Sequence, residues 1–99
     1  MNVTTGRKTV AALGTPERLV ADSVSARNVV IQAETDNTGK VAVGDANVNA
    51  TAPNERGAIL TAGQSVSISA GYEGAQVDLR SIFVGVSVNG DGVTFTAVV

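Results

Sequence analysis

The chain of 99 residues contains no cysteine, no histidine and no tryptophan. Without cysteine it has neither a disulfide framework nor a thiolate metal site. Without histidine it lacks the commonest metal ligand and the usual general base of enzymes. These absences argue against catalysis, and we expect no metal, no cofactor and no enzymatic activity.

Aromatic and charged side chains are also scarce. Two Phe and one Tyr are the only aromatics, and charged residues form 16% of the chain, with a net charge of −2. A slightly negative chain has no broad attraction for a polyanion, so we expect no nucleic-acid partner. No apolar run approaches the roughly 20 residues of a membrane-spanning helix, and residues 1–8 lack the apolar segment of an export signal. We therefore expect synthesis in a cytoplasm and no membrane partner.

Valine and alanine supply most of the apolar residues. The chain contains 17 Val and 14 Ala, which bury little area per residue, and burial is worth about 25 cal/mol per Å². A single domain of this length has marginal stability by itself. We therefore expect the protein to be stabilised by association, either with further copies of itself or with a larger surface.

Alternating apolar and polar residues predict β-strands along the whole chain. Turn residues separate these stretches at intervals of about ten residues, which is typical of a sandwich or a barrel. We expect an all-β fold, an antiparallel β-sandwich or jelly-roll-like barrel of seven to eight short strands. Residues 15–99 should form one domain, preceded by residues 1–14 as an amino-terminal arm or first strand. The predicted strands lie near residues 5–11, 17–21, 28–33, 40–44, 58–60, 65–69, 77–83 merging into 84–88, and 93–98.

The dipeptide Asn89-Gly90 is the clearest local signal. Apolar residues occupy alternate positions from Ile82 to Val88 before it, and the alternation resumes at Val93 after it. Asn-Gly between two such runs is the strongest short signal of a β-hairpin, because both residues tolerate positive φ. We expect the two flanking runs to pair with each other as a hairpin.

Two segments are candidates for a partner-binding surface. The longest irregular stretch, residues 45–57, has the length of loops that are usually functional or mobile. The amino-terminal segment carries two adjacent basic residues and is a candidate for an arm that becomes ordered only on a partner. The partner-binding residues that we predict are Arg7, Lys8, Asn47, Asn49, Asn54, Glu55 and Arg56.

Two turns contain possible oxygen ligands for a cation. Residues 36–39 and 89–92 combine Asp and Asn side chains with a flexible glycine backbone, as calcium-binding loops do. Neither turn has the alternating acids and the final bidentate Glu of a real calcium loop. We therefore interpret both as turns of the backbone, in which Gly and Asn provide positive φ.

Other candidate functional side chains have simpler explanations. The acid pairs Glu17 with Asp22 and Glu34 with Asp36 lie in or beside turns, where carboxylates are usually solvated, which disfavours a hydrolytic pair. Tyr72 is a candidate platform for stacking a sugar ring, although such a residue more often closes the edge of a core.

Several blocks of the chain occur in an order that indicates a family. They are NVVIQA at 28–33, TGKVAVGD at 38–45, GAILTAGQSV at 57–66, DLRSIFV at 78–84 and VNGDGVTF at 88–95. In this order and over about residues 15–98, the chain resembles small β-sandwich virion proteins of tailed bacteriophages. The amino-terminal segment is the part that is least matched.

The resemblance implies a structural component of a bacteriophage virion, of the kind used as a capsid decoration, cement or fibre-base protein. Such a protein would be synthesised in the bacterial host cytoplasm, and we expect this one on the capsid surface. Such a decoration or cement protein would bind the major capsid protein and reinforce the contacts between capsomers. It would be a homo-oligomer, with a trimer favoured, and the family supplies no catalytic positions. A fibre or tail adsorption domain of the virion is one alternative, and a stand-alone carbohydrate-binding module is another.

Overall fold

The computed structural model describes residues 2–71 and 74–99 of the chain. Within these residues the chain forms short β-strands and a single turn of 3-10 helix. The elements in chain order are β1 (Val3–Thr9), β2 (Glu17–Arg18), β3 (Ser25–Ala26), β4 (Asn28–Ala33), β5 (Val41–Gly44), β6 (Ala58–Leu60), β7 (Ser65–Ser69), β8 (Val77–Asp78), η1 (Leu79–Ser81), β9 (Phe83–Val86) and β10 (Gly92–Val98).

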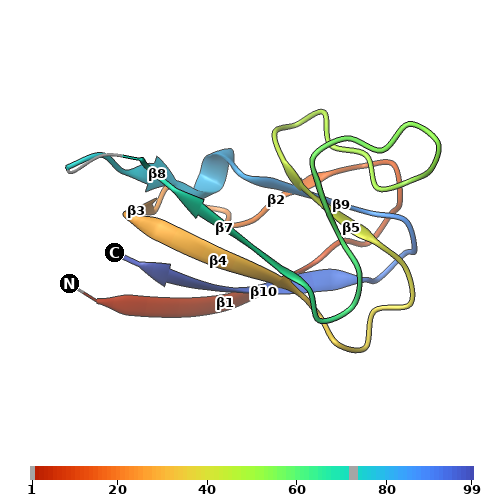
Figure 1. Ribbon diagram of the computed structural model, residues 1–99, viewed down its shortest axis with the longest axis horizontal. Helices are drawn as coiled ribbons and strands as arrows, with labels where there is room; N and C mark the ends of the chain where they lie inside the picture. Colours follow the sequence, from red (N-terminus) through yellow and green to blue (C-terminus); the bar gives the residue numbers. More distant parts are fainter. Residues whose placement is uncertain (1, 72–73) are drawn as a thin grey trace.

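Two antiparallel four-stranded sheets pack face to face (Figure 1). Sheet A has the strand order β1-β10-β4-β7, and sheet B has the order β2-β9-β5-β6. Strands β3 and β8 form a separate two-stranded ribbon. The predicted all-β, antiparallel and sandwich-like architecture is confirmed, and the sheets do not close into the alternative barrel.

The core lies between the two sheets and follows the alternation of the sequence. In β4, for example, Val29, Ile31 and Ala33 are fully buried, while the residues between them are exposed. Ile31 and Leu79 are the largest of the fully buried side chains, and most of the others are valines. Because alternate residues of a strand point to opposite faces, every strand of sheet A also presents a set of side chains to its outer face.

The chain turns at Asn89-Gly90 but does not form the predicted hairpin. Strand β9 pairs with β2 and β5 in sheet B, whereas β10 pairs with β1 and β4 in sheet A. The Asp91 amide donates to the Val88 carbonyl oxygen at 3.2 Å, and Gly90 has a φ of +87°. Asn89 lacks the positive φ that a type I′ hairpin turn needs at both central residues. The turn therefore carries the chain across the sandwich, and each apolar run enters the core from its own sheet.

Of two further segments, one adopts an alternative that the sequence left open and the other differs from the prediction. Residues 3–9 form β1, which pairs with β10 along its whole length, so the segment is a first strand of sheet A and not an arm awaiting a partner. The run predicted to continue from 77 through 88 is interrupted by η1. The Asp78 carboxylate accepts a hydrogen bond from the Arg80 amide at 3.0 Å, which stabilises this tight turn over an extended strand.

Candidate interaction surfaces

The outer face of sheet A is a regular array of small side chains. The strand registers align them in three rows, from β1 to β7: Val3, Val98, Asn28, Ser69; Thr5, Thr96, Val30, Ser67; and Arg7, Thr94, Gln32, Ser65. All of these residues are exposed except the half-buried Val98, and Arg7 alone is charged. We call these twelve residues the hydroxyl face. The interiors of protein interfaces are likewise depleted in charge, so in its low charge this face resembles a docking surface.

Arg7, one of the predicted partner-binding residues, lies at one corner of the hydroxyl face. Its guanidinium forms an ion pair with Glu34 at 2.7 Å. The Glu34 carboxylate extends over Gly92, because a Cβ atom at Gly92 would lie 2.7 Å from Glu34 Oε1. The hydrogen bond and the charge of Glu34 raise the pKa of Arg7. A glycine on β10 thus makes room for an acid that holds the arginine against the sheet.

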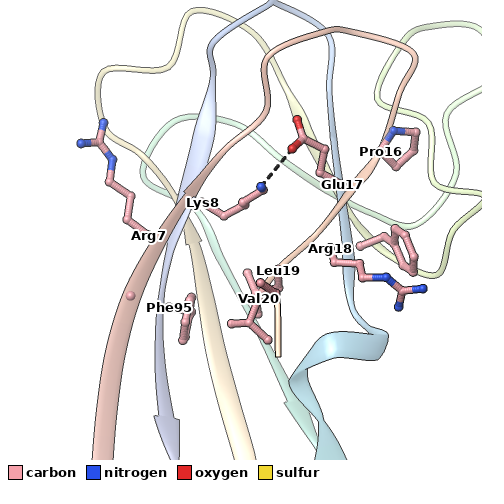
Figure 2. Close-up of a pocket in the computed structure, with 11 residues that line it drawn as sticks. Arg7, Lys8, Pro16, Glu17, Arg18, Leu19, Val20 and Phe95 are labelled. Carbon is pink, nitrogen blue, oxygen red and sulfur yellow. Dashed lines mark hydrogen bonds and ion pairs between the residues drawn. The ribbon is translucent and has the colours of Figure 1, made fainter. Parts of the chain in front are cut away.

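Lys8, the next predicted residue, points to the other side of β1, into an open groove between the edges of the two sheets (Figure 2). Lys8 Nζ lies 2.9 Å from Glu17 Oε1, and Glu17 Oε2 accepts a hydrogen bond from the Ala11 amide at 3.1 Å. The bond from Lys8, followed by that from Ala11, lowers the pKa of Glu17. A carboxyl that acts as general acid near neutral pH has a raised pKa instead, so Glu17 lacks that property.

Two aromatic rings border this groove. The Phe95 ring covers Gly6, its partner across β1 and β10, and a side chain at Gly6 would collide with it. The Arg18 guanidinium stacks over Phe83 at 4.8 Å, within the range of a cation–π contact. Arg18 Nη1 also donates to the Arg80 carbonyl oxygen at 2.9 Å. Lys8 is paired with Glu17, and Arg18 is held by the Phe83 ring and the Arg80 carbonyl oxygen. The groove is therefore a weak candidate for binding an anion.

The loop of residues 45–57 covers the outer face of sheet B. Val48 and Ala50 are buried and pack with Ala42 of β5 in a second small core. Gly44 of β5 and Gly57 allow this approach, because a Cβ atom at either position would lie only 2.9 Å from the Val48 side chain. The loop is therefore part of the folded structure, and sheet B has no free outer face in this region.

The predicted residues of this loop lie on its solvent side. Asn47, Asn54, Glu55 and Arg56 are exposed. Asn49 is half-buried and joins Arg56 through two backbone hydrogen bonds of 3.0 and 2.8 Å. Glu55 forms an ion pair of 3.1 Å with Lys40, the residue before β5. These loop residues form one surface beside sheet B.

The structure does not bring all the predicted residues together. The loop residues lie outside sheet B, whereas Arg7 lies on the outer face of sheet A, on the opposite side of the sandwich. The hydroxyl face was missed by the sequence prediction. Its signal is visible in alternating runs such as SVSIS at 65–69, but the order of the strands in the sheet is needed to assemble the runs into one surface.

The two turns considered as calcium loops, residues 36–39 and 89–92, are joined to each other by hydrogen bonds. The buried Asp91 carboxylate accepts hydrogen bonds from the amides of Thr38 at 3.3 Å and Gly39 at 2.8 Å. The Asn37 side chain forms two hydrogen bonds with the backbone of Gly92. Its Nδ2 donates to the Gly92 carbonyl oxygen at 2.8 Å, and its Oδ1 accepts from the Gly92 amide at 3.1 Å. In the part of the chain that the structure describes, no three His, Cys, Asp or Glu residues gather as metal ligands. Asp91 therefore connects two segments of backbone.

Tyr72, considered as a stacking platform, lies outside the described residues. Among residues 2–71 and 74–99 the one helical element is the three-residue η1, which is too short to cross a bilayer. Comparison of the chain with protein-family models, curated proteins and solved structures found no match.

Proposed function

We propose that this chain is a structural protein of a bacteriophage virion, most specifically a capsid decoration protein that binds the major capsid protein on the outer shell. The observation that carries the proposal is the hydroxyl face, in which one of twelve aligned residues is charged. Burial of small neutral side chains against a coat subunit avoids the desolvation cost of charged groups. Because the strands already fix the backbone, docking loses little conformational entropy.

The arrangement of surfaces also suits a protein that strengthens a shell. The molecule is elongated, with extents of 37 × 23 × 22 Å, and the hydroxyl face and the 45–57 loop lie on opposite sides of the sandwich. One copy could therefore contact one coat subunit through sheet A and a neighbouring subunit or copy through Asn47, Asn54, Glu55 and Arg56. Several modest contacts formed together give a large combined affinity, which would raise the barrier to opening the shell.

A charge placed in the centre of the hydroxyl face tests this proposal. Thr96 is exposed in the middle row, so Thr96→Glu should weaken binding to shells assembled from the coat protein of the same phage at least tenfold, measured by co-sedimentation. Thr15→Glu introduces the same charge in an exposed loop outside the face and should bind like the wild type. Circular dichroism verifies that both variants are folded.

Two results would contradict the proposal. One is equal binding of the Thr96→Glu and Thr15→Glu variants to the shells. The other is that shells saturated with the wild-type chain open at the same temperature as bare shells, since a decoration protein must raise that temperature.

The same face favours one alternative, an adsorption domain of a fibre or tail that binds glycans. Hydroxyl and amide groups such as those of Thr94, Gln32 and Ser65 can hydrogen-bond to the hydroxyls of a sugar. A glycan array separates the two functions. Specific glycan binding that Gln32→Ala abolishes, together with no binding to shells, would favour the adsorption domain.

A further inference from the structure

Strand β1 forms a free edge of sheet A and runs along the lower margin of the molecule in Figure 1. Just beyond its two ends, Asn2 exchanges backbone hydrogen bonds with Val99 at 3.0 and 2.8 Å, and the Val10 amide donates to the Asp91 carbonyl oxygen at 3.0 Å. Antiparallel pairs alternate between bonded and non-bonded positions, so the even residues between them also bond to β10. The odd residues of β1, from Val3 to Thr9, therefore direct their N–H and C=O groups outward. Within the described residues no other segment pairs with this edge.

This edge lacks most of the features that usually protect an exposed strand. Charged side chains are one such feature, and β1 carries Arg7 and Lys8, but both are paired within the chain, with Glu34 and Glu17. Edge strands are commonly very short, or are interrupted by a proline or a bulge. At the edges of sheet B, β2 has two residues and β6 has three, whereas β1 has seven. The register of β1 with β10 continues without a bulge from Val3 opposite Val98 to Thr9 opposite Gly92. The strand thus offers four outward pairs of donor and acceptor groups.

We propose that β1 binds the β1 strand of a second copy, antiparallel about a two-fold axis, with Gly6 of one copy opposite Gly6 of the other. In this register all seven residues of β1 find a partner. Thr5 faces Arg7 of the second copy and Val3 faces its Thr9, so no two charges of the same sign are opposed. A continuous eight-stranded sheet results, with the two hydroxyl faces side by side.

The other registers that match outward groups are less complementary. A pairing centred on Arg7 places the two arginines opposite each other, and one centred on Lys8 does the same for the lysines, which destabilises a strand pair. A pairing centred on Thr5 uses five of the seven residues of β1. Charge and length together therefore select the register centred on Gly6.

Pairing of β1 with β1 of a second copy also gives an assembly of defined size, a dimer. The other edge of sheet A, β7, has five residues, and pairing β1 of one copy with β7 of the next is a head-to-tail contact. Head-to-tail contacts run on into open chains unless a rotation closes them, whereas a two-fold contact closes with two copies. The dimer differs from the trimer that the resemblance favours, and the inference does not depend on binding to a capsid.

Proline substitutions at the two edges test the proposal by sedimentation from micromolar to millimolar concentration. Thr5 directs its N–H outward, and edge positions of this kind tolerate proline, so Thr5→Pro should fold but remain a monomer at concentrations where the wild type is dimeric. Ser67→Pro is the matched control, because Ser67 occupies the equivalent outward position on β7 and should leave the dimer intact. A monomeric wild type at millimolar concentration, or a dimeric Thr5→Pro variant, would overturn the proposal.

Cysteine cross-linking tests the register independently, since the chain has no cysteine of its own. Residues in a hydrogen-bonded antiparallel pair have Cα atoms about 5.5 Å apart, which is the usual spacing in a disulfide. The double variant Val3→Cys/Thr9→Cys should therefore form a covalent dimer on mild oxidation, and each single variant should not. A double variant that stays uncross-linked while sedimenting as a dimer, or a single variant that cross-links efficiently, would refute this register.

Discussion

Replacement of Asp91 by alanine removes the carboxylate that connects the turn at 36–39 to the turn at 88–91. Asp91 is 7% exposed, and its carboxylate accepts hydrogen bonds from the amides of Thr38 and Gly39 at 3.3 and 2.8 Å. The connection holds β10 of sheet A against the segment that leads into β5 of sheet B. We therefore expect Asp91→Ala to weaken the contact between the two sheets at this end of the sandwich.

The magnitude follows from the two hydrogen bonds. A hydrogen bond to a charged group contributes about 1.5–3 kcal/mol, and the longer bond to Thr38 should be the weaker one. Thr38 is exposed and Gly39 half-buried, so water can replace part of what the amides lose. We expect a loss of about 2–3 kcal/mol in the free energy of unfolding, a large share of the roughly 5–15 kcal/mol of a typical domain. For a domain of this size the melting temperature should fall by roughly 10–20 °C.

Thermal unfolding followed by circular dichroism measures this effect, because the chain has no tryptophan and one tyrosine. Asp91→Asn should lose part of the stability, since its amide keeps one acceptor oxygen but places an N–H group against the second donor. Asp36→Ala is the matched control, because Asp36 lies in the 36–39 turn that holds the two donor amides, and Asp36 is exposed. It should change the free energy of unfolding by no more than about 0.5 kcal/mol.

The reasoning would be refuted if Asp91→Ala were as stable as Asp36→Ala. Such a result would mean that water satisfies the Thr38 and Gly39 amides as well as the carboxylate does. A loss far above about 3 kcal/mol would instead mean that the interlocked turns unfold together with the adjacent strands.

Two further predictions concern stability. Gly92→Ala should lower the free energy of unfolding by about 1–3 kcal/mol in a denaturant titration, because the new Cβ would lie 2.9 Å from Thr9 Cα and displace Glu34; unchanged stability would contradict this. The pKa values of Glu17 and Asp78 are lowered in the folded state, so their contribution is present above the ordinary carboxyl range near pH 4 and is lost as pH falls through the folded-state pKa values. The variant Glu17→Gln/Asp78→Asn should therefore lose less stability than the wild type between pH 7 and 3, and an equally steep loss would refute the assignment.

Only part of the candidate surfaces could be predicted from local patterns in the sequence. The alternating Ser residues of 65–69 and the exposed character of Asn54 and Arg56 can be read from the chain. The hydroxyl face could not be predicted, because it depends on β1, β10, β4 and β7 being neighbours, and these strands are far apart in sequence. The cover of sheet B by the 45–57 loop likewise depends on the small core of Ala42, Val48 and Ala50, against which Phe83 packs from a distant part of the chain.

Local alternation alone determined where most strands form, as the matching limits at 28–33, 58–60 and 65–69 show, because a period of two directs every second side chain to one face. Which strands pair was decided by tertiary packing. Val86 and Val93 are both buried when β9 and β10 lie in opposite sheets, so the turn between them spans the sandwich even though Asn89-Gly90 is a hairpin sequence. The interlocking of Asp91 with the 36–39 turn arises in the same way, since its donors lie more than 50 residues away in the chain.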